Sequence, residues 1–196
     1  MSDEQRVAAH RLVACALSSQ GYQKAVAIMH LDDIVMANFH ETVFASLPGP
    51  FEMGKEFYWL AVFGDPAGEA PWGWQLEGHH LVLNFTVVGD NIAVTPAFLG
   101  ADPAEVQRGL LAGWRVMGQE MDLGFALLAS MTDKQLETVI LSNDIPQNLF
   151  TGTAGKGKAL SEYEGLPAAE LDEEQQQLLW DLIAEYVNNA DAKLAA

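Results

Sequence analysis

The sequence predicts an α+β protein, with N-terminal helices, a central antiparallel β-meander and C-terminal helices packed on the sheet. Three observations support this class. Apolar residues recur with a helical period over residues 1–36 and again over residues 113–187. Between them, residues 57–98 contain short aromatic and β-branched runs separated by turn residues. Helices and strands segregated in this way favour a single domain, residues 1–196.

Two helices are expected ahead of the sheet. Ser2 and Gln5 have the spacing of a capping box, which predicts the start of a first helix, and Gly21 is its expected stop. A second helix is expected over residues 22–36. Two prolines and a glycine within residues 46–50 then break any regular element.

Four strands are expected in the middle of the chain. They cover residues 57–63, 72–75, 79–88 and 92–98. The run Gly89-Asp90-Asn91 is a hairpin turn signal between the last two strands. Because short connections join antiparallel neighbours, these strands form a meander.

Further helices are expected after the sheet. Asp102 to Glu105 combine an N-cap, a proline at the first helical position and an acid, which predicts a helix start. The helical period is clear over residues 113–130, and residues 142–165 are expected to form a long loop. Capping pairs open two more helices: Thr132 with Gln135, and Asp172 with Gln175.

Composition excludes several classes of protein. The chain has 10 basic and 27 acidic residues, a net charge of −17, which disfavours binding to nucleic acid or to an anionic membrane. A single cysteine, Cys15, excludes an internal disulfide framework. The acidic start is unlike a signal peptide, and no apolar run approaches the roughly 18 residues of a membrane span. The expected location is therefore cytoplasmic.

Residues 71–84 hold the densest group of chemically distinctive side chains. In a regular strand His79 shares an apolar face with Leu81, whereas His80 shares the more polar face with Asn84. The adjacent histidines therefore point to opposite sides. They are not expected to bind one metal unless Gly78 introduces a bulge.

Histidine is both a common metal ligand and the usual acid–base group near neutral pH. His79, His80 and Glu77 are therefore the candidate metal ligands, with zinc, copper or iron as the candidate cofactor. His79, His80 and Glu120 are the candidate catalytic residues, since Glu120 lies between glycines that allow close packing of its helix. The alternative for the histidines is a structural role, with ring nitrogens hydrogen-bonded in the core. The alternative for Glu120 is an exposed acid.

The aromatic and amide side chains of the same stretch are candidate ligand contacts. Trp72, Trp74 and Asn84 could line a pocket for a small molecule, although core packing is the commoner use of such a tryptophan pair. A group of histidines and acids nearer the N-terminus matches no metal template and is interpreted as solvated or capping: His30, His40, Asp32, Asp33 and Glu41.

The sequence resembles the "domain of unknown function 3500" family. The resemblance rests on Phe57-Tyr58-Trp59, on the block from Pro71 to His80, on Thr95-Pro96 and on Gln119-Glu120-Met121-Asp122. It extends to Glu185-Tyr186-Val187-Asn188-Asn189 and so covers most of the chain. The family is functionally uncharacterised. The resemblance implies a short member or fragment that lacks the family's terminal segments, and it supports the candidate site residues.

Two functions follow from these observations. The first is a metal-dependent or acid–base enzyme with its site around the Trp72 to His80 strand, acting on a small molecule. The second is a non-catalytic interaction module in which the histidines are structural and the apolar face of the terminal helix docks on a partner.

Overall fold

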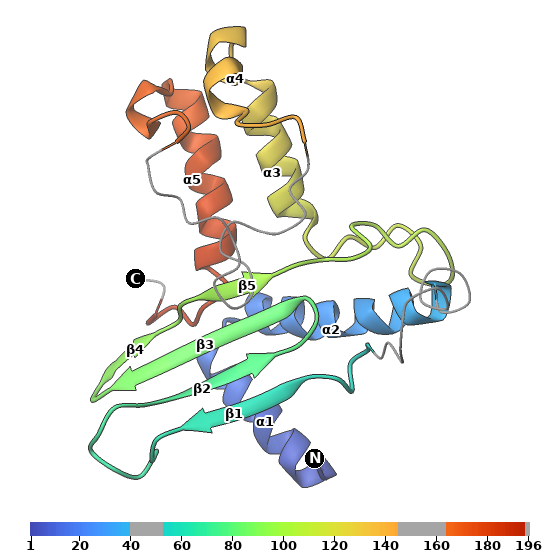
Figure 1. Cartoon of the computed structure of the whole chain (residues 1–196), viewed down its shortest axis with the longest axis vertical. Helices are drawn as coiled ribbons and strands as arrows, with labels where there is room; N and C mark the ends of the chain where they lie inside the picture. Colours follow the sequence, from blue (N-terminus) through green and yellow to red (C-terminus); the bar gives the residue numbers. More distant parts are fainter. Residues whose placement is uncertain (40–52, 145–163, 195–196) are drawn as a thin grey trace. The chain divides into compact units, whose positions relative to one another are not determined.

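The computed structural model describes residues 1–39, 53–144 and 164–194 (Figure 1). The predicted α+β class is confirmed, because helices precede and follow an antiparallel sheet of five strands. The chain forms two compact units, Met1–Gly118 with Ala184–Ala196, and Gln119–Ile183. That these make one domain stays a prediction. The predicted break at 46–50 and most of the predicted loop at 142–165 lie outside the described residues.

The first unit begins with helices α1 (Asp3–Ala16) and α2 (Ser19–Phe39). The capping box of Ser2 and Gln5 is confirmed, with both reciprocal hydrogen bonds present. The predicted stop at Gly21 is wrong. Leu17 leaves the first helix in an extended conformation and pairs with Ala190, so Gly21 lies inside α2. A Cβ at Gly21 would overlap the backbone of Asn189, which explains a glycine in a helix.

All strand pairs of the sheet are antiparallel, in the order β1-β2-β3-β4, and β5 pairs with β3. The predicted meander is therefore confirmed. The strands are β1 (Trp59–Phe63), β2 (Trp72–Glu77), β3 (Leu81–Val88), β4 (Asn91–Ala93) and β5 (Ala97–Leu99). The predicted strand 92–98 is interrupted before Ala97, because Pro96 has no amide to donate to a ladder.

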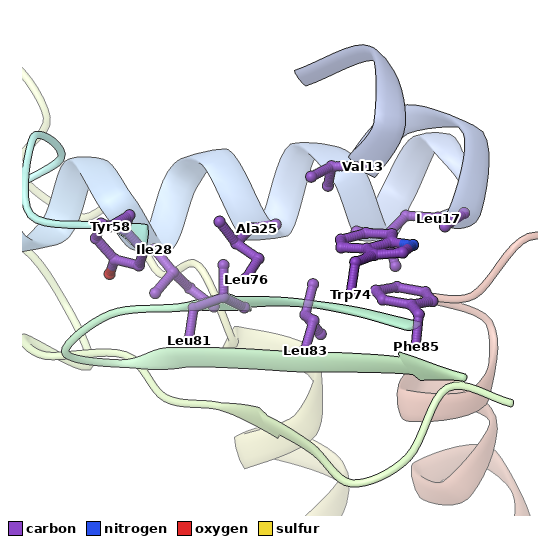
Figure 2. Packing of buried hydrophobic residues seen from close by; sticks show 11 residues of the cluster. Val13, Leu17, Ala25, Ile28, Tyr58, Trp74, Leu76, Leu81, Leu83 and Phe85 are labelled. Carbon is purple, nitrogen blue, oxygen red and sulfur yellow. The ribbon is translucent and has the colours of Figure 1, made fainter. Parts of the chain in front are cut away.

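The core of the first unit lies between α2 and one face of the sheet (Figure 2). Ala25 and Ile28 of α2 are buried against the ladder of β2 and β3. Trp74 of β2 stacks on Phe85 of β3, with 3.9 Å between the ring centroids. These neighbours bury the two adjacent strands along one face and fix the position of the β2–β3 connection beneath α2.

The second unit is helical. It contains all of α4 (Asp133–Val139) and of the 3₁₀ turn η3 (Ala168–Glu170). It also contains α3 (Gly118–Ala129) except for Gly118, and the part of α5 (Glu173–Val187) that ends at residue 183. The capping pairs Thr132 with Gln135 and Asp172 with Gln175 are confirmed. In the described part of the chain, no helix is long and apolar enough to span a bilayer.

Two expectations about the segment between the sheet and the end of α3 are wrong. The helix start predicted at residues 102–105 is absent, and the helix predicted from residue 113 begins at Gly118. The reason is local: Gly109 and Gly113 adopt left-handed backbone conformations, with φ of 81° and 88°. A residue with such a φ ends or prevents a right-handed helix, so residues 101–117 form turns instead.

Candidate metal centre

Asp32 is a fully buried carboxylate on the core-facing side of α2. Ala25, Ile28, Asp32 and Val35 follow one another by three, four and three residues, and each is at most 3% exposed. This spacing places all four on one face of the helix. The helix therefore presents a charged side chain to the interior at the place where its apolar stripe would continue.

Tyr58, just before β1, binds this carboxylate from the sheet side. Its hydroxyl donates a hydrogen bond of 2.6 Å to Asp32 Oδ2. Tyr58 itself belongs to the hydrophobic core and is 7% exposed. The segment before Tyr58 also contacts α2, because the Lys55 side chain forms a 2.9 Å ion pair with Asp33. The backbone amide of Lys55 donates a hydrogen bond to the Asp33 carboxylate as well.

His79 and His80 connect β2 to β3. Glu77 pairs with Val82, and the amide of Gly78 donates to the carbonyl of Leu81, which leaves the two histidines at the tip of the hairpin. The Nδ1 atom of each ring lies 3.2 Å from Asp32 Oδ1. The ring centroids are 3.8 Å apart.

The expectation that these histidines point to opposite faces is wrong. It assumes a strand that begins at His79, whereas β3 begins at Leu81. In a tight hairpin connection the alternation of a strand does not hold, so both rings turn toward the same carboxylate oxygen. Gly78 permits this arrangement, because a Cβ at that position would overlap the ring of Tyr58.

The charge of Asp32 is stabilised by its neighbours. Burial alone would raise the pKa of its carboxyl, but the hydrogen bonds from His79, His80 and Tyr58 together hold that pKa well below its ordinary value. Burial, followed by the bond to Asp32, raises the pKa of Tyr58. At neutral pH the site therefore contains a carboxylate and a protonated phenol.

The three side chains have the geometry of a metal site. Asp32, His79 and His80 each offer one ligand atom, and these atoms lie within 4.8 Å of one another. Ligands bound about 2.1 Å from an ion stand roughly 3.0–3.4 Å apart at octahedral or tetrahedral angles. The two Oδ1–Nδ1 distances of 3.2 Å fall in this range. Access is from the histidine side, since the His79 side chain is 38% exposed and Asp32 is not exposed.

The sequence profile of one family, described as "Protein of unknown function (DUF3500)", matches residues 1–196. The chain belongs to this family. The resemblance seen in the sequence is thereby confirmed, and no curated protein and no solved structure matches the chain. The function of this DUF3500 member is therefore inferred from the geometry of its own residues.

The other candidate residues of this DUF3500 chain are not members of the three-residue group. Glu77 is exposed at the end of β2, whereas Trp74 is buried in the core, and Trp72 packs partly buried against it. The amide of Asn84 donates a 2.7 Å hydrogen bond to the carbonyl of Pro96. Glu120 is buried on α3, in the second unit. Catalytic or ligand-binding roles for these residues stay predictions.

The interpretation of Asp32 as a solvated or capping residue is wrong, because the side chain is fully buried. A signal is present in the sequence: Asp32 continues the stripe of Ala25 and Ile28 at helical spacing. Tyr58 gives no such signal, since its partner is 26 residues away in the chain. His40 and Glu41, from the same N-terminal group, lie outside the described residues.

Proposed function

We propose that this DUF3500 member is a metal-dependent enzyme whose ion is bound by Asp32, His79 and His80. The observation that carries the proposal is the convergence of two imidazole Nδ1 atoms on one oxygen of a buried carboxylate, at 3.2 Å each. A buried carboxylate facing two histidines is a costly arrangement for a purely structural purpose.

The donor set narrows the choice of metal. Two imidazoles with one carboxylate bind zinc in hydrolases and iron(II) in non-haem oxygenases. Copper also binds such nitrogen-rich sites strongly, so it is tested with the other two. Three protein ligands leave coordination positions for water or substrate, which is typical of a catalytic rather than a structural site.

The three ligands have different roles at the proposed ion. Asp32 supplies the negative charge that offsets part of the ion's charge, and its burial keeps that carboxylate away from bulk water. His79 is the more exposed ligand, at 38%, and His80 is 20% exposed, so a substrate reaches the ion past the hairpin tip. A bound ion would supply a Lewis acid and an activated water, or a site for oxygen.

Metal content tests the proposal. Tagless protein is purified without chelator and analysed by plasma mass spectrometry, before and after reconstitution with zinc, iron(II) and copper. Wild type is expected to hold about one ion per chain of one of these metals. The variant His79→Asn/His80→Asn keeps an amide donor near each Nδ1 position but removes both imidazoles, and it is expected to lose the ion.

A matched control removes two histidines elsewhere. His10 and His30 are exposed and lie outside the group, so His10→Ala/His30→Ala is expected to keep the full metal content. Wild type that stays metal-free after reconstitution contradicts the proposal, as does an unchanged content in the His79→Asn/His80→Asn variant. The interaction module or a metal-free acid–base pocket would then be the better explanation, and partner capture would come before a substrate screen.

A further inference from the structure

The two oxygens of Asp32 have different surroundings. Oδ1 faces the Nδ1 atoms of His79 and His80, whereas Oδ2 accepts the 2.6 Å hydrogen bond from the hydroxyl of Tyr58. Asp32 is not exposed at all, so water does not compete for either oxygen. The carboxylate is therefore oriented with one oxygen toward the proposed ion and the other toward the phenol.

The position of the phenol is fixed by its surroundings. The ring of Tyr58 packs against Gly78 so closely that a Cβ there would overlap it, and the side chain is 7% exposed. Gly78 directly precedes the two histidines, so the ring of Tyr58 contacts the turn that carries two of the proposed ligands. The hydroxyl of Tyr58 binds the carboxylate that is the third ligand. The ion pair of Lys55 with Asp33 holds the segment ahead of Tyr58 on α2.

We infer that Tyr58 is a positioning residue that restricts Asp32 to one-oxygen coordination and so sets the metal preference of the site. This inference rests on the proposed metal site. A carboxylate can bind an ion through one oxygen or through both, and large ions with high coordination numbers use both. With Oδ2 accepting the hydrogen bond of the phenol, a second metal contact through this oxygen would compete with that bond and reorient the carboxylate. Small ions of low coordination number, zinc above all, are therefore favoured.

Tyr58→Phe tests this role because it removes the hydroxyl and keeps the ring against Gly78. Affinities for Zn²⁺ and for the larger Cd²⁺ are measured by competition with a chromophoric chelator. The Zn²⁺ Kd is expected to rise about 10- to 100-fold, as for other residues that orient a metal ligand. The Cd²⁺ Kd is expected to rise much less, because the freed Oδ2 can join the larger ion, so the preference for Zn²⁺ over Cd²⁺ falls.

A spectroscopic readout separates this role from a loss of packing. The visible absorption of bound Co²⁺ weakens as its coordination number rises, so Tyr58→Phe is expected to weaken the band at saturating Co²⁺. Tyr22→Phe is the matched control, because the Tyr22 hydroxyl also forms a side-chain hydrogen bond, with His10 Nδ1 at 3.0 Å, but outside the site. It is expected to leave both affinities and the Co²⁺ spectrum unchanged.

The failures of the two proposals are distinguishable. Wild type that binds neither Zn²⁺ nor Cd²⁺ contradicts the metal site itself, and the inference falls with it. Wild type that binds Zn²⁺, with a Tyr58→Phe variant that has the same Zn²⁺:Cd²⁺ preference and the same Co²⁺ spectrum, overturns the inference and leaves the metal site standing. An equal loss of affinity for both ions with an unchanged spectrum also overturns the inference, because it shows a packing role alone.

Discussion

Two buried polar clusters, one in each unit, differ in the charge they bury. In the helical unit, Gln175 is 2% exposed, and its amide donates to the carbonyl of Ser130 and to Gln135. In the sheet unit, Asp32 is fully buried, and its partners are two imidazoles and a phenol. The first cluster contains neutral amides; the second contains a carboxylate.

This difference supports a chemical role for the Asp32 cluster and a structural role for the amide cluster. The neutral cluster joins the end of α3 to the starts of α4 and α5, and its bonds to backbone atoms satisfy groups that the helix ends leave open. A neutral amide does this without the desolvation cost of a charge. The Asp32 cluster carries that cost and collects imidazole nitrogens around one oxygen, which a structural link does not require.

The largest expected effect is that of Asp32→Asn. The change removes the charge that three donors surround, and we expect it to lower the free energy of unfolding by about 3 kcal/mol near neutral pH. It is also expected to abolish metal binding, because an amide oxygen is a weaker ligand than a carboxylate. Urea denaturation in the presence of chelator measures the first effect, and metal content the second. An unchanged free energy of unfolding would show that the hydrogen-bond partners of Asp32 do not stabilise its buried charge.

The same variant gives a pH dependence of known sign. The pKa of Asp32 is lower in the folded chain than its ordinary value of 3.8, so its ionised form stabilises the fold. This contribution is complete above about pH 4 and is lost as the pH falls toward the folded pKa. Wild type and Asp32→Asn are therefore expected to converge in stability below about pH 4 in chelator, as measured by thermal melts. A gap that widens at acid pH would contradict the assignment.

A smaller effect is expected from Gly78→Ala. Its Cβ would overlap the ring of Tyr58, so the ring or the hairpin tip must shift, at a cost of about 2 kcal/mol and with weaker metal binding. Gly124→Ala on α3 is the matched control, since a Cβ there meets nothing within 4 Å. In a helix that substitution is expected to stabilise by about 0.5–1 kcal/mol. Similar melting temperatures for the two variants would contradict the close packing at Gly78.

The smallest expected effect is that of Gln175→Ala in the helical unit. The loss of its bonds to Ser130 and Gln135 is expected to cost about 1–2 kcal/mol. Metal content is expected to stay at the wild-type value, because no ligand atom belongs to that cluster. Thermal melts and mass spectrometry of one preparation measure both quantities. A loss of metal in this variant would show that the two clusters are not independent.

Much of the fold is predictable because its signals are local. The capping pairs Ser2 with Gln5, Thr132 with Gln135, and Asp172 with Gln175 act over three residues, and all are confirmed. The turn at Gly89 is equally local, and it is confirmed by the pairing of Val88 with Asn91. Some bounds that sequence patterns misplace depend on distant partners, such as the end of α1, where Leu17 pairs with Ala190.

The candidate site is predictable only in part. His79 and His80 are conspicuous, but as the two tip residues of the hairpin they are none of Gly, Asn and Asp, which usually mark a two-residue turn, so the sequence favours a strand there. The burial of Asp32 is not predicted, because Asp33 follows it and two adjacent acids suggest a solvated surface. Only the tertiary structure, which brings α2 over the hairpin tip, shows that one acid is buried and the other pairs with Lys55.

The most direct test of the metal centre is crystallographic. Crystals of the zinc- or iron-loaded protein are measured at the absorption edge of the metal, and an anomalous difference map locates the ion. We expect one strong peak about 2.0–2.2 Å from Asp32 Oδ1 and from one ring nitrogen of each of His79 and His80. A map with no peak there, or with its strongest peak at an exposed histidine such as His30, would contradict the proposed metal centre.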